Sequence, residues 1–215
     1  MRRFAQRAST AIAAAATTVS LTAVPASAAP ATWTVTPGGV VTWANTRGIL
    51  AVNTDTGVSA FHCPVSAVSA TMPGGTGLPG TGIAALTDVT FSGCAGTATS
   101  PTVTPANLPW SFNAVSYNAG TGVTSGTVTG FTVTVSTGYC TFTIGAPGGG
   151  PGMISATYTN SNPNTAVDLI DLSSTDLEVQ TTSGSGCASL YVPGHDITLL
   201  GQYGVVPPGQ TITSP

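Results

Sequence analysis

The residue types that carry most enzyme chemistry are scarce in this chain. It contains two histidines, His62 and His195, and no lysine. A Ser-His-Asp hydrolase would use one histidine as its base, but His195 has only an adjacent aspartate in sequence and no G-x-S-x-G elbow occurs. The absence of lysine excludes a P-loop, a Schiff-base lysine and a Ser–Lys dyad. We therefore expect both histidines to be structural and the protein to be non-enzymatic.

Acidic residues gather in the segment VDLIDLSSTDLEV as Asp168, Asp171, Asp176 and Glu178. Carboxylates at this density could bind calcium, or two of them could flank a sugar in a glycosidase. Asp176 and Glu178 alternate with Leu177 and Val179, as solvent-facing residues of a strand do. The pattern favours a solvated strand face, and calcium binding by the four carboxylates stays open.

Gly75–Gly80 spells G-x-G-x-x-G, the fingerprint of a dinucleotide-binding loop. Such a loop requires a helix immediately after it, whose first amides hold the pyrophosphate. Here Pro79 lies inside the motif and the following residues, 83–94, have the composition of a strand. We expect no nucleotide cofactor, and we interpret the glycines as turn residues within a long loop.

Residues 1–28 have the pattern of a secretory signal peptide, with three arginines, an alanine-rich apolar run and a small-residue cleavage site at Ala26–Ala28. This predicts a secreted protein, either released or associated with the cell envelope, with no membrane insertion. Residues 29–215 have one base, Arg47, against seven acids, a formal net charge of −6. Nucleic-acid binding is excluded, because phosphate backbones are held by clusters of Lys and Arg.

Four cysteines remain in the exported chain: Cys63, Cys94, Cys140 and Cys187. An even number outside the cell indicates disulfides, and four cysteines allow three connectivities. We favour the sequential pairs Cys63–Cys94 and Cys140–Cys187. No C-x-x-C spacing suggests zinc.

After residue 28 the chain alternates apolar and polar residues in short runs broken by Gly, Pro, Asn or Asp, which is typical of strands and turns. A hairpin turning at Pro37–Gly39 is expected to set Trp33 opposite Trp43 and Val35 opposite Val41. Other hairpins are expected to turn at Thr137–Gly138, with Val135 opposite Cys140, and near 118–122. Later strands are expected at 153–161, 176–181, 188–192 and 197–206.

These strands predict an all-β protein: an antiparallel β-sandwich, Ig-like or a larger sandwich or barrel, stapled by disulfides. We expect residues 29–215 to form a single domain. An alternative of two small β lobes of about 90 residues, with a boundary near 99–109, stays open, because TVTP occurs both at 34–37 and at 102–105.

Several stretches together, TWTVTPGG, GTGLPGTGI, LTDVTFSGC, LPWSFNA and the ending QTITSP, resemble a group of small secreted proteins of high-GC actinobacteria. That resemblance implies a secreted β-rich protein and no particular activity. The start APATWTVTP is also similar to the opening of the neocarzinostatin-type chromoprotein carriers. This second resemblance implies an Ig-like sandwich with two disulfides that holds a small apolar cargo.

Three functional hypotheses follow. The first is a non-enzymatic extracellular or envelope-associated protein that binds a surface or is a structural component, with cell-wall glycan, a protein or a small apolar ligand as possible partner. The second is a small-ligand carrier with a pocket between sheets. The third is a secreted hydrolase that uses His195 or the acidic segment. We expect no metal and no cofactor.

Overall fold

The regular structure of the described chain, residues 32–96, 100–161 and 167–215, consists of β-strands. The strands of the described chain pair antiparallel, which confirms the predicted all-β antiparallel class. Residues Ala31–Pro215 form one compact unit. The expected signal peptide, 1–28, lies outside the described residues.

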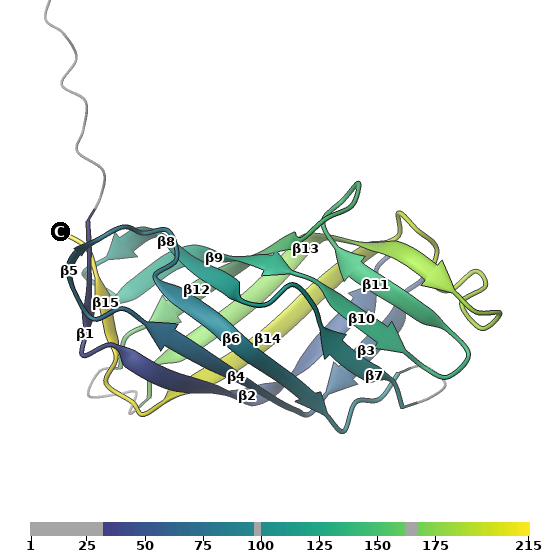
Figure 1. Ribbon diagram of the computed structural model, residues 1–215, viewed down its shortest axis with the longest axis horizontal. Helices are drawn as coiled ribbons and strands as arrows, with labels where there is room; N and C mark the ends of the chain where they lie inside the picture. The colour runs from purple at the N-terminus through teal and green to yellow at the C-terminus, as the bar shows by residue number, and fades with distance from the viewer. Residues whose placement is uncertain (1–31, 97–99, 162–166) are drawn as a thin grey trace, which may run out of the picture. The chain divides into compact units, whose positions relative to one another are not determined.

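A closed barrel forms the centre of this unit (Figure 1). Its strands pair in the order β12-β9-β8-β6-β4-β2-β14-β13, and β13 pairs with β12 to close the ring. Their bounds are β2 Gly39–Asn53, β4 Val65–Met72, β6 Ala84–Ser92, β8 Trp110–Asn118, β9 Val123–Phe131, β12 Gly152–Thr159, β13 Leu169–Ser183 and β14 Asp196–Val206. The sequence predicts an Ig-like sandwich or a larger sandwich or barrel, and the structure is a barrel.

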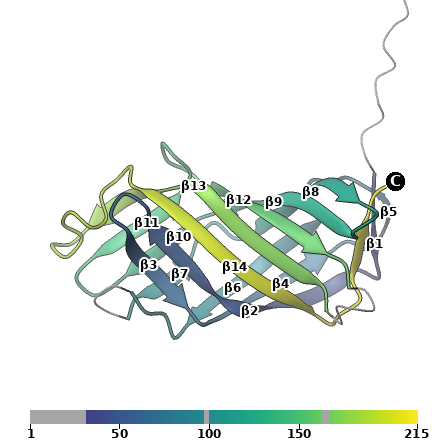
Figure 2. The same ribbon diagram turned by 180° about the vertical axis from the view of Figure 1, so that it is seen from behind.

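Three barrel strands, β2, β13 and β14, are long enough to continue beyond the barrel into an extension of the same sheet, which also contains β3, β7, β10 and β11. The first half of β2 pairs with β4, and its second half pairs with β3 (Val58–Cys63). In the same way β13 leaves β12 and pairs with β11 (Thr141–Gly145), followed by β10 (Val133–Ser136) and β7 (Thr102–Pro105). Figure 2 shows β13 and β14 side by side in front as they pass from the barrel into this extension.

A small sheet lies at the other end of the barrel, in the order β15-β1-β5 (Figure 1). Its strands are β1 Trp33–Thr36, β5 Gly75–Leu78 and β15 Thr211–Thr213. Its side chains Trp33, Val35 and Ile212 are buried. We refer to this sheet as the end sheet.

The predicted hairpin at Pro37–Gly39 is wrong. The partners of β1 are β15 and β5, whereas β2 enters the barrel. Gly38 packs so closely against Gly74 that an added Cβ would lie 2.5 Å from the Gly74 Cα, and the Gly38 N–H donates to Gln210 Oε1 at 3.0 Å. Contacts distant in sequence therefore direct this turn. Trp33 and Trp43 are nevertheless both buried.

The other hairpins are present, with one difference in register. β8 and β9 form the hairpin expected near 118–122. β10 and β11 pair Val135 with Phe142 rather than with Cys140, because the turn contains four residues, Thr137–Cys140. A shift of two residues keeps each side chain on its predicted face. The strand expected at 188–192 is wrong, since this segment is a series of turns.

Both disulfides of the favoured pairing are present, Cys63–Cys94 and Cys140–Cys187, and they are consistent with an extracellular location. All four cysteines are buried. In the extension, Tyr191 stacks on Phe142 with 4.2 Å between ring centroids. The disulfide, this aromatic contact and the hydrogen bond from the Tyr191 hydroxyl to the Ser59 carbonyl, at 3.0 Å, all hold the turn segment that contains Cys187 and Tyr191.

Candidate functional site

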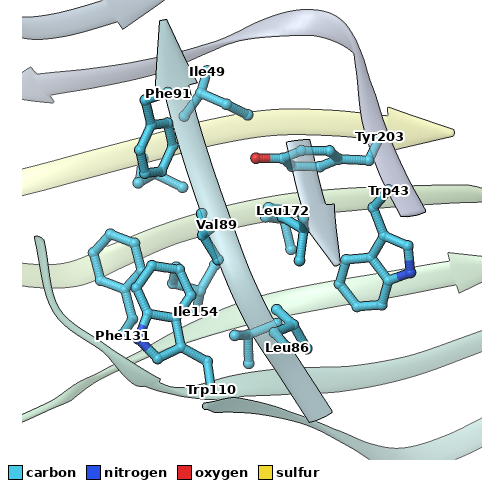
Figure 3. Close-up of a pocket in the computed structure, with 13 residues that line it drawn as sticks. Trp43, Ile49, Leu86, Val89, Phe91, Trp110, Phe131, Ile154, Leu172 and Tyr203 are labelled. Carbon is cyan, nitrogen blue, oxygen red and sulfur yellow. The ribbon is translucent and has the colours of Figure 1, made fainter. Parts of the chain in front are cut away.

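The barrel interior contains an apolar cavity of about 20 Å³ (Figure 3). Ligand pockets usually measure about 300–1,000 Å³, and a space of this size holds one water at most. The cavity is lined by Trp43, Ile49, Val68, Leu86, Val89, Phe91, Trp110, Val128, Phe131, Ile154, Leu172, Leu199 and Tyr203. The side chains thus fill the barrel, and the pocket that a small-ligand carrier needs is not formed here.

Three residues that line this apolar interior carry a polar side-chain atom: Trp43, Trp110 and Tyr203. The Trp110 indole N–H donates to the Ala106 carbonyl at 2.8 Å. In Figure 3 the indole nitrogen of Trp43 lies on the side away from Leu86 and Leu172, and it has no hydrogen-bond partner among the described residues. The hydroxyl of Tyr203 lies 2.9 Å from the Ser66 hydroxyl. Burial raises the pKa of Tyr203 to about 12, and the hydrogen bond with Ser66 lowers it by a smaller amount.

We expect the protein to lose stability above pH 10. Because Tyr203 ionises at about pH 12 when folded and at its ordinary pKa of 10.0 when unfolded, its contribution is complete below pH 10 and is lost as the pH rises toward 12. The free energy of unfolding should fall by about 1.4 kcal/mol per pH unit from this residue. Burial and the charge of Asp168 also raise the pKa of Tyr158. Urea unfolding between pH 8 and 12 measures the slope, which should become shallower in Tyr203→Phe; an unchanged slope would contradict this assignment.

The ring of His195 lies beside a buried side-chain amide. Its Nδ1 lies 3.0 Å from Nδ2 of Asn53, a buried amide that also donates to the Leu190 carbonyl at 2.8 Å. No hydroxyl or carboxylate in the described part of the chain is hydrogen-bonded to the His195 ring, so the hydrolase hypothesis gains no triad there. His62 is exposed on β3 and belongs to the surface described below.

The four acidic residues of 168–178 are not brought together. Asp176 is exposed and Leu177 and Val179 are buried, as predicted, and Glu178 accepts a hydrogen bond from the Gly148 N–H at 2.7 Å. The solvated position predicted for Asp168 is wrong, because this residue is completely buried. Within the described ranges no three His, Cys, Asp or Glu side chains form a possible metal site.

Asp168 instead fastens the end sheet to the barrel. Its Oδ1 accepts from the Ser161 N–H at 2.6 Å, and its Oδ2 accepts from the N–H groups of Gly209 and Gln210, each at 2.9 Å. The Gln210 carbonyl in turn accepts from the Tyr158 hydroxyl at 2.9 Å. The carboxylate therefore joins the ends of β12 and β13 to the segment that leads into β15.

The glycine motif is likewise structural. Gly75–Leu78 is strand β5, not part of a loop, and a turn leads from it directly into β6. Gly75 and Gly77 have positive φ, as expected of such glycines. Gly80 packs against Trp33, where an added Cβ would lie 2.7 Å from the indole nitrogen. No described helix follows the motif, so the structure lacks the helix N-terminus that a dinucleotide site requires.

A furrow of about 570 Å³ lies on the outer face of β2, β3, β13 and β14. It lies where the long strands leave the barrel for the extension. Its lining residues are Arg47, Gly48, Leu50, His62, Asp171, Leu172, Ser173, Leu200, Gly201 and Gln202. We call this surface the furrow.

Irregularities in the strands lie along the furrow. The register of β14 against β2 shifts between Leu200 and Gln202 and again before Tyr203, and that of β13 against β14 shifts between Ser174 and Leu177. Bulges bend a strand and increase its twist. We attribute the concave outer face to these bends, at the point where β2 changes partner from β4 to β3.

The floor of the furrow is aliphatic. Leu50 and Leu200 lie opposite each other in the β2–β14 register, and Leu200 is 49 % exposed. His62 lies opposite Leu50 on β3. Its ring covers Gly48, where an added Cβ would lie 2.4 Å from His62 Nε2. Glycine at position 48 therefore leaves room for the imidazole at this end of the furrow.

A polar row runs beside this floor. Arg47, Gln202 and Asp171 are consecutive partners across β2, β14 and β13. Thr46 Oγ1 donates to Gln202 Oε1 at 2.8 Å, and Gln202 Nε2 donates to Asp171 Oδ1 at 2.8 Å. This chain of bonds orients the Asp171 carboxylate. The guanidinium of Arg47 forms no hydrogen bond or ion pair with any described residue and stays available to a ligand.

Hydroxyl groups extend the furrow over the neighbouring strands. Two smaller hollows, of about 260 and 130 Å³, share residues with it and with each other. Their hydroxyl-bearing residues are Ser125, Ser155, Thr157, Ser173, Ser174, Thr175 and Thr198. In register, Asp171 faces Thr157 and Thr157 faces Ser125, so the polar row continues onto β12 and β9.

Comparison with protein-family models, with curated proteins and with solved structures found no match, so the geometry of the furrow is the basis of the functional argument. None of the described residues belongs to a helix that is long and apolar enough to span a bilayer.

Proposed function

We propose that this chain is an exported, non-catalytic binding protein that holds its ligand in the furrow. The observation that supports this most directly is that Arg47, which has no partner among the described residues, lies beside an aliphatic floor in a hollow large enough for a ligand. Binding sites combine apolar contact area with a few oriented polar groups, and Gln202 and Asp171 are oriented by hydrogen bonds. The cleavage-site pattern of residues 1–28 and the two disulfides support export.

Leu200→Ser tests this proposal, with Val206→Ser as the matched control. Both residues are on β14 and about half exposed, 49 % and 54 %, but only Leu200 lines the furrow. Burial of the exposed half of a leucine by a ligand is worth about 1 kcal/mol, so Leu200→Ser should weaken binding about fivefold. Val206→Ser should leave binding unchanged.

The measurement uses the full chain, expressed with its own N-terminus and recovered from the culture medium. Co-sedimentation with insoluble bacterial cell walls, and titration with a panel of soluble polysaccharides, gives the affinities. Equal binding by the two variants would overturn the furrow as the site, and retention of the chain inside the cell would overturn export. Release of new reducing ends from a bound polysaccharide would show that the protein is an enzyme.

A further inference from the structure

We infer that the ligand of the furrow is a glycan that presents one carboxylate to Arg47 and neutral, hydroxyl-bearing sugars to the strands beyond it. This inference rests on the proposed function and names its ligand class. It follows from three features of the furrow: its charged side chains, its rows of hydroxyl groups, and the main-chain hydrogen bonds that its strands already form within the sheet.

The two ends of the furrow carry opposite charges, with Arg47 on β2 at one end and Asp171 on β13 at the other. Arg47 is the sole basic residue after position 28 and has no partner among the described residues, and the exposed imidazole of His62 lies at the same end. A planar guanidinium suits a carboxylate, which it can bind through two parallel hydrogen bonds. The cationic end of the furrow is therefore the place for an acidic group.

The other end of the polar row excludes further acidic groups. Asp171 lies two strands from Arg47, about 10 Å away at the usual strand spacing. Asp176 lines the adjoining hollow. A second carboxylate over these residues would be repelled, and a phosphate dianion would exceed the charge of one arginine. A single, monovalent acidic group at one end of the ligand fits best.

The remaining lining suits sugar hydroxyls. A carboxylate such as Asp171 accepts hydrogen bonds from hydroxyl donors, and Thr157, Ser155 and Ser125 can donate to or accept from a polyol. Leu50 and Leu200 offer an aliphatic surface for the C–H face of a sugar ring. Together these groups match the mixed polar and apolar surface of a glycan chain.

A peptide strand matches the furrow less well. Peptides commonly bind sheets by adding a strand to a free edge, where main-chain N–H and C=O groups are open. At the edge strand β3, the main chain of His62 is paired with Ala95. The two strands that carry Asp171, Leu200 and Gln202 have partners on both sides: β14 pairs with β2 and β13, and β13 pairs with β14 and β12 along the barrel. Their main-chain groups are used in the sheet, so recognition depends on the side chains.

Three tetrasaccharide-sized probes test the charge pattern: neutral xylotetraose, a xylo-oligosaccharide with one glucuronic acid, and tetragalacturonic acid. Isothermal titration of the full exported chain should give the highest affinity for the mono-acid. Arg47→Gln should weaken mono-acid binding roughly tenfold or more, to the level of the neutral sugar, and should weaken xylotetraose binding by a much smaller factor. Asp171→Asn should strengthen tetragalacturonate binding about fivefold. Asp88→Asn, an exposed acid on β6 outside the furrow, should change nothing.

The possible failures are distinguishable. If Arg47→Gln binds the mono-acid as tightly as the unchanged protein does, the carboxylate inference is overturned, whereas a loss of binding in Leu200→Ser still supports the furrow as the site. If a short peptide with a free C-terminal carboxylate binds more tightly than all three sugars, the inference that the ligand is a glycan is overturned. If Leu200→Ser also has no effect on any probe, the proposed function fails as well.

Discussion

Replacing Cys140 and Cys187 by alanine is expected to lower the free energy of unfolding by about 4 kcal/mol. The bond joins residues 47 apart in sequence, and closure of a loop of this length removes about that much entropy from the unfolded chain. Alanine adds no polar atom to these buried positions. Urea unfolding of the double variant measures the change.

The second disulfide is the matched control for this result. Cys63–Cys94 closes a loop of 31 residues, so the entropic model gives almost the same loss for its removal. The local consequences should differ, because Cys187 belongs to the turn segment that holds Tyr191 against Phe142. Hydrogen exchange should therefore increase over 184–194 in the Cys140/Cys187 variant alone. A loss below about 1 kcal/mol would mean that the unfolded chain is already compact.

Side-chain faces were more predictable than strand partners. Alternation places Trp33, Val35, Val41 and Trp43 on one face, and all four are buried, although β1 pairs with β15 and not with β2. A strand's period of two is local, and it marks the buried face whatever the partner is. The partner depends on contacts such as Gly38 with Gly74 and Gln210, which no local pattern contains.

Asp168 shows how a single bulge makes the prediction of buried and exposed faces from alternation fail. Counting back from the buried Leu177 and Val179, the even-numbered residues of the segment should face solvent. The register shift between Ser174 and Leu177 exchanges the two faces, so that Ile170 and Ser174 are buried and Asp171 is exposed. Residues 168, 170 and 172 lie on the same face of a regular strand, and Ile170 and Leu172 are apolar. These two residues alone would therefore have predicted that Asp168 faces the barrel interior.

The furrow could not be predicted, because it arises from the same irregularities. The single base after residue 28 marked Arg47 as unusual, but nothing in the sequence placed it beside Gln202 and Asp171. Their proximity requires β14 to lie between β2 and β13. The strands β2 and β14 are more than a hundred residues apart in the sequence, so no local pattern indicates that they pair. Local patterns predict hairpins and the buried face of each strand, but they do not predict which distant strands pair to close the barrel.

Asp168→Ala is expected to destabilise the protein by about 3–5 kcal/mol. The substitution leaves three N–H groups, those of Ser161, Gly209 and Gln210, without their acceptor at a buried site, and each such loss costs about 1–3 kcal/mol. For a chain of this size the melting temperature should fall by about 10 °C. Asp176→Ala, an exposed carboxylate on β13, is the control and should change the free energy of unfolding by less than about 0.5 kcal/mol.

The loss should be concentrated at the end sheet. Because Gln210 leads into β15, and β15 pairs with β1, release of this segment exposes Trp33 before the barrel opens. In a variant whose barrel tryptophans, Trp43 and Trp110, are replaced by phenylalanine, the fluorescence of Trp33 should therefore report a transition at lower urea concentration than far-ultraviolet circular dichroism, which follows the barrel strands. Asp168→Asn keeps one acceptor oxygen and should lie between the wild type and alanine. If the fluorescence and dichroism transitions of Asp168→Ala coincide, the carboxylate stabilises the whole unit and not the attachment of its end sheet.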